Sequence, residues 1–257
     1  MLRPGPYATV NFEDLYHRQV ICEPMEDLRT IRLQDENHFL ELLQAYSRKS
    51  HLIEALTPDV VVLQEVSKAD IIGAGAPFGA WAGSNKHKGL GVLGITPAHY
   101  TMTEQASSAL PWNLPFSVNG LNIIALWAHK LTQDQRYVRI THRIADAHSE
   151  FLGSGPGLIL GDFNSNTVWD REHPGRNHSM LVDKLERLGL DSVFHRQEGC
   201  PQGEENIKTY FHRKNADHGH HIDYAFLSIT LDASIRVGEP TEWLQHSDHM
   251  PLILDIH

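Results

Sequence analysis

The sequence predicts a single α/β domain. Two observations support this prediction: short apolar runs alternate along the chain with amphipathic patterns of helical period, and no repeat or long linker divides the chain. The 257 residues are enough for one large domain with a sizeable core. Hydrophobic residues make up 41% and charged residues 21% of the chain, a balance that is typical of globular proteins and excludes a mostly disordered one.

Six apolar segments are predicted as buried strands, because each is short, rich in Val, Ile and Leu, and bounded by polar or turn-forming residues. They are residues 59–63, 90–95, 121–127, 157–160, 222–227 and 251–256. Between them, amphipathic patterns predict helices at residues 36–55, 133–152 and 179–188, the last ending at Gly189. Residues 12–35 show no clear pattern.

Polar residues stand at the ends of several predicted strands. They are Glu65 after residues 59–63, His129 after 121–127, Asp162 and Asn164 after 157–160, Asp223 at the start of 222–227, and Asp248 with His249 before 251–256. Strand ends in an α/β sheet meet in one crevice, which is where such folds place their sites. We therefore expect these side chains to share one site.

The stretch "LILGDFNSN" carries the clearest chemistry. Gly161 permits a tight exit from the strand, and Asp162 and Asn164 are expected to point to the same face, because extended residues alternate with period two. A carboxylate beside an amide can hold a water molecule and take its proton. The alternative is a surface turn, since Asp and Asn are common turn formers.

Glu65 follows a strand that is too apolar to tolerate an unpaired charge, so it needs a cation. Oxygen donors from Glu65, Asp162, Asn164 and Asp248, with no cysteine among them, favour Mg²⁺ or Mn²⁺ over zinc. The alternative for Glu65 is a salt bridge with a nearby Lys or Arg. The two cysteines, Cys22 and Cys200, have no metal-binding spacing and are expected to be plain thiols.

Charge and composition narrow the class of protein further. A formal net charge of −10 argues against a protein that coats nucleic acid, although an acidic enzyme can act on a phosphodiester when metal ions cancel the local charge. No apolar run is long enough for a membrane span or a signal peptide, so we expect a soluble cytoplasmic protein. Several of the 18 histidines lie within residues 212–221, which indicates either a solvated loop or affinity for a transition metal.

Five stretches, in this order, resemble the endonuclease/exonuclease/phosphatase superfamily, which includes pancreatic-type deoxyribonuclease and abasic-site endonucleases. They are "VVVLQEV", "LNIIALWAHK", "LILGDFNSN", "HHIDYAFLS" and "HSDHMPLILDI", and the resemblance covers about residues 58–257. It implies a four-layer α/β/β/α sandwich in which two mixed sheets face each other and the site lies at one end.

The resemblance also implies a role for each site residue. Glu65 matches the metal-binding glutamate, and Asp248 matches a carboxylate close to the metal. Asp162 and Asn164 match the pair that activates and positions the attacking water. His249 matches the histidine that contacts the scissile phosphate, Asp223 matches the aspartate that orients it, and His129 matches a histidine that contacts the phosphate or assists the leaving group.

The amino-terminal part of the chain matches the family least well. The family's first strand ends in an asparagine that assists the metal site, and the nearest counterpart here is Asn11. A single domain over residues 1–257 would then carry an inserted or poorly matched segment at about residues 12–50.

The resemblance implies a Mg²⁺- or Mn²⁺-dependent phosphoester hydrolase, and the favoured substrate is DNA or RNA. Basic residues that could contact a nucleic-acid backbone are Lys86, His87, Lys88, Lys130, Arg213 and Lys214. Two alternatives stay open: a small phosphomonoester or phosphodiester such as a phosphorylated sugar, inositol or lipid headgroup, and a catalytically silent scaffold of the same fold. No protein partner is predicted.

Overall fold

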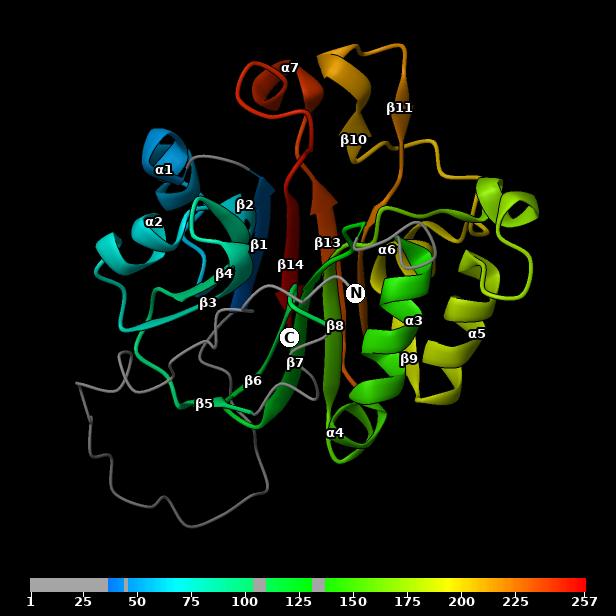
Figure 1. Cartoon of the computed structure of the whole chain (residues 1–257), viewed down its shortest axis with the longest axis horizontal. Coiled ribbons are helices and arrows are strands. Elements are labelled where there is room, and N and C mark those ends of the chain that lie inside the picture. Colours follow the sequence, from blue (N-terminus) through cyan, green and yellow to red (C-terminus); the bar gives the residue numbers. More distant parts are fainter. Residues whose placement is uncertain (1–36, 44–45, 104–109, 131–136) are drawn as a thin grey trace, which may run out of the picture.

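The computed structural model describes residues 37–43, 46–103, 110–130 and 137–257. Its strands form two six-stranded sheets and one short hairpin. Figure 1 shows α1 and α2 on one outer side of the two sheets and α3 and α5 on the other.

The first sheet has the strand order β13-β14-β1-β2-β4-β3. Its strands are β1 (Asn37–Leu43), β2 (Val60–Val66), β3 (Phe78–Asn85), β4 (Lys88–Gly94), β13 (Ala233–Val237) and β14 (Leu252–Ile256). Only β1 and β2 pair in parallel, and the other neighbours are antiparallel. The strand that follows Asp248 and His249 therefore lies two positions away from the strand that carries Glu65.

The second sheet has the order β5-β6-β7-β8-β12-β9. Its strands are β5 (Tyr100–Met102), β6 (Asn113–Val118), β7 (Leu121–Trp127), β8 (Gly157–Asp162), β9 (Leu190–Ser192) and β12 (Asp223–Ser228). The parallel pair β7 and β8 places the end of β7 beside Asp162, because Trp127 is the register partner of Asp162. On the other side of β8, Asp223 is the antiparallel partner of Asp162.

Most of the helices cover the outer faces of the sheets. They are α1 (Tyr46–Glu54), α2 (Lys68–Gly73), α3 (Val138–Ala147), α4 (Ser149–Gly153), α5 (His178–Arg187), α6 (Val193–Glu198) and α7 (Pro240–Trp243). Two 3-10 helices, η2 (Thr167–Glu172) and η3 (His212–Lys214), and the hairpin strands β10 (Tyr210–Phe211) and β11 (Gly219–His220) complete the described chain. In Figure 1 the hairpin and α7 project beyond one end of the sheets.

Three apolar clusters hold these layers together. The first lies between the sheets and includes Val62, Leu254, Phe116 and Leu160. The second packs the other face of the second sheet against α3, α4 and α5, and the third packs the first sheet against α1, α2 and α7. Successive residues of β7 alternate between the first two clusters, which is why the strand is a continuous apolar run.

The six predicted strands are all present, with ends that shift by up to three residues. The predicted helix at 36–55 is wrong in its first half, because residues 37–43 form β1 and the helix begins at Tyr46. The run of apolar residues there fits a short strand as well as a helix, and pairing with β2 and β14 decides between them. The helix predicted at 133–152 divides at His148 into α3 and α4.

Part of the segment predicted to be inserted or poorly matched, at about residues 12–50, forms a strand of the first sheet. Residues 37–43 belong to the first sheet, where they form the strand between β14 and β2. Asn11, predicted to end the first strand, lies outside the described residues.

Candidate active site

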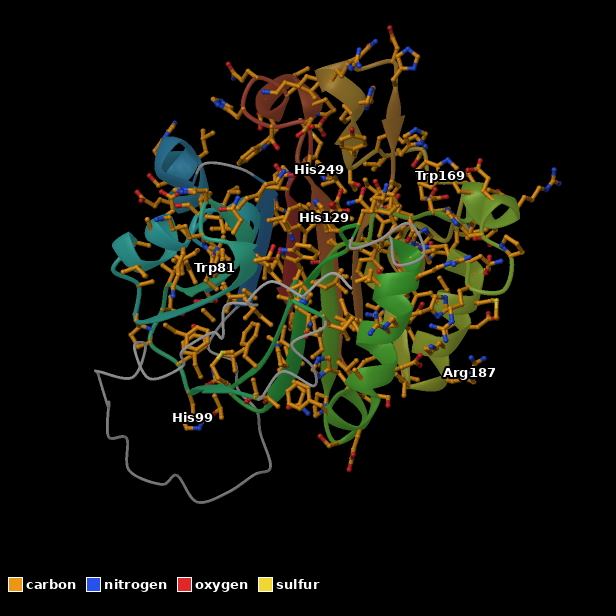
Figure 2. The ribbon with its side chains drawn as sticks, in the orientation of Figure 1. Trp81, His99, His129, Trp169, Arg187 and His249 are labelled. Atoms are coloured by element: carbon orange, nitrogen blue, oxygen red, sulfur yellow. The ribbon has the colours of Figure 1, made fainter. Side chains whose placement is uncertain are left out.

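Six of the predicted site residues, Glu65, His129, Asp162, Asn164, Asp248 and His249, line one cleft at an end of the two sheets, with a cavity volume of about 230 Å³, and Asn11 lies outside the described residues. Figure 2 shows His129 and His249 together at this end, and His99 far from both. The residues that line the cleft are Glu65, Trp127, His129, Lys130, Tyr137, Asp162, Asn164, Tyr210, Asp248 and His249. Asp223 contacts His249 from beneath the cleft.

Asp162 is the last residue of β8 and is almost completely buried. Gly161 before it has φ 139°, and a Cβ at this position would lie 1.9 Å from the carbonyl oxygen of Leu126. Only glycine therefore lets β8 approach the end of β7 this closely. This approach sets the carboxylate of Asp162 between two strands whose own ends also reach the cleft.

Asn164 reaches Asp162 through a turn and not through extended alternation, so the geometry expected from period two is wrong. Its φ is 46°, and its backbone N–H donates to Oδ1 of Asp162 over 2.7 Å. The side-chain amide donates to Oδ2 of Asp162 over 2.6 Å and to the carbonyl oxygen of Ala128 over 3.0 Å. The structure has the turn that the sequence left open as an alternative, and this turn brings the two side chains into contact.

His249 and Asp223 form a buried pair. Nδ1 of His249 lies 3.0 Å from each carboxylate oxygen of Asp223. Burial opposes charging of the ring, but the charge and hydrogen bond of Asp223 outweigh it and raise the pKa of His249 to about 9. The imidazole is therefore positively charged at neutral pH.

The hairpin strand β10 braces the segment that carries His249. Phe211 N–H donates to the Asp248 carbonyl over 2.7 Å, and Met250 N–H donates to the Thr209 carbonyl over 2.6 Å. Tyr210, between them, places its ring 4.6 Å from the His249 ring. These contacts fix the position of His249 at the cleft.

Asp162 lies in surroundings that disfavour the ionised form of its carboxyl group. Burial raises its pKa well above the ordinary value for a carboxyl group, and the nearby charge of Asp223 adds to the shift. Asp162, Asp223 and His249 each offer one ligand atom, and these atoms lie within 4.8 Å of one another. A divalent cation near these carboxylates would relieve the crowding of negative charge.

Glu65 and Asp248, the residues predicted to hold a metal, line the same cleft but lie outside that tight group. Glu65 sits at a bulge in β2, with φ 56°. Its Oε1 forms a salt bridge with Nζ of Lys88 over 2.8 Å. The salt bridge that the sequence left open as an alternative is thus present. The residues that line the cleft offer carboxylate oxygens from Glu65, Asp162 and Asp248 and the amide oxygen of Asn164, a set that suits Mg²⁺ or Mn²⁺.

His129 follows β7 and belongs to an aromatic group at the cleft wall. Its ring lies 4.7 Å from the rings of Trp112 and Trp127, and its Nδ1 lies 3.0 Å from the carbonyl oxygen of Lys130. This packing holds the ring at the edge of the cleft.

Tyr137 and Tyr210 also line the cleft, and sequence reasoning missed both. Tyr210 lies in the hairpin arm just ahead of the "HHIDYAFLS" stretch, which could have drawn attention to it. Tyr137 has no comparable sequence signal, because it reaches the cleft from the start of α3.

A second polar cluster, also missed, lies behind the loops that follow β8 and precede β12. We call it the buried polar cluster; its members are Asn166, His178, His195, Glu205, His221 and Tyr224. Oε1 of Glu205 accepts from Asn166, from the Gly203 N–H and from His195 over 2.9–3.1 Å. The Asn166 amide also donates to the His221 carbonyl, so the cluster ties together the two loops that deliver Asn164 and Asp223.

Burial and hydrogen bonding shift the pKa values of the buried polar cluster. It lowers the pKa values of His178 and His221 to about 4, so both rings are neutral in the folded protein at neutral pH. For Glu205 burial acts in the opposite direction, but the hydrogen bonds from His195 and Gly203 outweigh it and lower its pKa to about 2.

Among the described helices, none has the length and apolar character that a membrane crossing requires.

No family model and no curated protein sequence matches the chain. Solved structures match most of it. The 3′ phosphatase NExo from Neisseria, bound to a product DNA hairpin, has a TM-score of 0.62 at 17% identity, covering 86% of this chain and 99% of that one. An AP endonuclease from Archaeoglobus fulgidus has a TM-score of 0.64 at 14% identity, covering 85% and 98%.

An endonuclease/exonuclease/phosphatase protein from Beutenbergia cavernae has a TM-score of 0.61 at 14% identity, and the match covers 87% of this chain and 72% of that one. At these identities the comparison speaks to the fold. The mixed α/β architecture with its two sheets agrees with that comparison and with the order of the sequence motifs. The chain therefore has the fold of the endonuclease/exonuclease/phosphatase superfamily.

Proposed function

We propose that the protein is a divalent-metal-dependent phosphoester hydrolase whose substrate is a nucleic-acid phosphodiester. The observation that carries this proposal is the meeting of two pairs in one cleft: Asp162 with Asn164, and His249 with Asp223. One pair suits activation of water and the other suits stabilisation of phosphate charge. The names of two structural neighbours, an AP endonuclease and a 3′ phosphatase bound to a DNA hairpin, support a nucleic-acid substrate.

Asp162 would accept the proton of the attacking water. A raised pKa brings a carboxylate closer to the operating pH and so makes it a better general base than an ordinary aspartate. The two hydrogen bonds from Asn164 hold the carboxylate in one orientation, and the bond from Asn164 to the Ala128 carbonyl holds the amide itself. The base is thus positioned before substrate arrives.

His249 would stabilise the negative charge that develops on the phosphoryl oxygens. It is charged at neutral pH because its pKa is about 9, and Asp223 fixes the orientation of its ring. Glu65 and Asp248 would hold Mg²⁺ or Mn²⁺, which when bound supplies positive charge that offsets the charge of the phosphate. His129 and Lys130 border the same cleft and would face the phosphate or its leaving group.

The test is nicking of supercoiled plasmid in Mg²⁺ and in Mn²⁺ by wild type, His249→Ala and His99→Ala. His99 is exposed and lies far from the cleft, so its variant controls for the loss of a histidine, and the His249→Ala protein, prepared identically, controls for contaminating nuclease. We expect the wild type and the His99→Ala protein to nick, and the His249→Ala protein to be slower by about two to four powers of ten.

Equal nicking by the His249→Ala protein would contradict the assignment of His249. Absence of nicking by the wild type, with metal-dependent hydrolysis of bis(p-nitrophenyl) phosphate, would replace the nucleic-acid substrate by a small phosphoester. Absence of turnover on both substrates would favour the catalytically silent scaffold.

A further inference from the structure

We propose that Lys88 competes with the divalent cation for the carboxylate of Glu65 and, when displaced, contacts the phosphate of the substrate. This inference rests on the proposed function. Lys88 is the first residue of β4, and its Nζ lies 2.8 Å from Oε1 of Glu65 and 5.5 Å from the centre of the Trp127 ring. Both partners line the cleft, so the ammonium group lies at its wall.

The backbone beneath this pair is fixed. The Trp81 indole donates to the carbonyl oxygen of Val66, the residue after Glu65, over 3.1 Å. A Cβ at Gly89, the residue after Lys88, would lie 2.4 Å from the same indole. Trp81 therefore holds both chain segments in place, and any movement of the Lys88 charge comes from its flexible four-carbon stem.

The ion pair itself does little for stability. The side chain of Lys88 is 48% exposed, and ion pairs of this exposure contribute little to folding because water screens them. Its effect is on charge at the cleft. An ammonium group on the Glu65 carboxylate and a divalent cation on the same carboxylate repel each other, so each weakens the binding of the other.

Trp127 is a second partner of the same ammonium group, and it remains when the Glu65 carboxylate is taken by a cation. A lysine charge is attracted to the face of an indole ring, and this ring borders the cleft. Beside Trp127, the Lys88 ammonium group stays at the wall of the cleft and faces a bound phosphate. The same residue would thus lower the affinity for the metal and raise the affinity for the substrate.

The experiment compares Lys88→Met with Lys184→Met. Lys184 also pairs with a carboxylate, that of Asp146, but on the outer face formed by α3 and α5. The control therefore loses the same charge and the same kind of contact away from the cleft. Two quantities are measured: Mn²⁺ affinity by calorimetry without substrate, and the steady-state kinetics of nicking of supercoiled plasmid.

We expect Lys88→Met to bind Mn²⁺ about three to ten times more tightly than wild type, because a competing charge is removed. We also expect its KM to rise about tenfold with kcat within about threefold of wild type, as for the loss of a uniform binding contact. Lys184→Met should match wild type in both measurements. If either change is missing in Lys88→Met, the proposal is overturned.

The design separates this inference from the proposed function. A wild type that binds Mn²⁺ and hydrolyses DNA, with a Lys88→Met variant that behaves identically, overturns only the role of Lys88. A wild type that neither binds Mn²⁺ nor turns over any phosphoester overturns both.

Discussion

Two polar clusters flank the loops that leave β8 and enter β12, and they are built from the same residue types. In the cleft, Asp162 and Asp223 stand close together, and burial with this crowding raises the pKa of Asp162. In the buried polar cluster, Glu205 accepts three hydrogen bonds and its pKa falls to about 2. The carboxylates differ in their partners, and this difference gives them opposite effects on folding.

The comparison teaches that the cleft is assembled at a cost in stability that the cluster behind it offsets. A carboxyl group whose pKa is raised in the folded state destabilises that state at neutral pH, whereas one whose pKa is lowered stabilises it. The buried polar cluster holds the two loops that present Asn164 and Asp223. Substitutions in the two clusters should therefore separate activity from stability.

The largest expected effect is on activity, in Asp162→Asn. The variant keeps the shape of the side chain but removes the base, so the rate of phosphodiester hydrolysis should fall by about two to four powers of ten. The melting temperature should rise at pH 7, because the variant no longer buries a carboxyl group whose pKa is raised in the folded state. Steady-state kinetics and thermal unfolding measure the two effects on the same sample.

Asp183→Asn is the matched control, since Asp183 is exposed on α5. It should leave both the rate and the melting temperature near those of wild type. A lower melting temperature in Asp162→Asn would contradict the electrostatic description of the cleft, even if activity were lost.

Much of the cleft could be predicted from the sequence, because its residues stand at strand ends. A strand is a local pattern, and the polar residue that follows it is fixed in place by the strand. The strand-end pattern predicts the positions of Asp162, His249 and Glu65. The choice between an extended path and a turn at Asn164 could not be made from the sequence, because its positive φ depends on bonds to Asp162 and Ala128 that only the folded chain provides.

The buried polar cluster and β1 could not be predicted for a related reason. Glu205 pairs with His195 and Asn166, which lie in different elements, and no sequence spacing joins them. β1 has the apolar content of either a helix or a strand, and its neighbours β2 and β14 settle the choice. Non-local contacts decide both cases.

The second prediction concerns the pH dependence of folding stability, to which the histidines of the buried polar cluster contribute. The unfolded chain binds protons at His178 and His221 below their ordinary pKa of 6.5, whereas the folded protein binds them only below about 4. Stability from these two groups is therefore complete above pH 6.5 and is lost as the pH falls toward 4. Each histidine should contribute about 3 kcal/mol to this loss.

Urea unfolding at pH 7 and at pH 4.5 measures this effect in wild type and in His221→Asn. The asparagine amide can donate to the Ile207 carbonyl as Nδ1 of His221 does, so the main contact is kept. The variant should lose less stability on acidification than wild type, and His99→Asn should not differ from wild type. An unchanged pH dependence in His221→Asn would show that the ring is not held neutral by the fold.

The smallest expected effect is that of Glu205→Gln. The amide keeps the shape and can accept the same bonds, but the charge that strengthens the bonds from Asn166, Gly203 and His195 is gone. We expect a loss of about 1–3 kcal/mol in the free energy of unfolding. At a temperature where the variant is folded, kcat should stay within about threefold of wild type, because Glu205 touches no residue that lines the cleft in these contacts.

Glu204→Gln is the control for this substitution, since Glu204 is the exposed neighbour of Glu205 and should tolerate the change. The comparison between the clusters predicts opposite outcomes for two substitutions that each replace a buried carboxylate by an amide: Asp162→Asn loses activity and gains stability, and Glu205→Gln loses stability and keeps activity. A Glu205→Gln protein that is stable but inactive would reverse this assignment, because the buried carboxylate would then act on the chemistry through the loops it holds and not on folding.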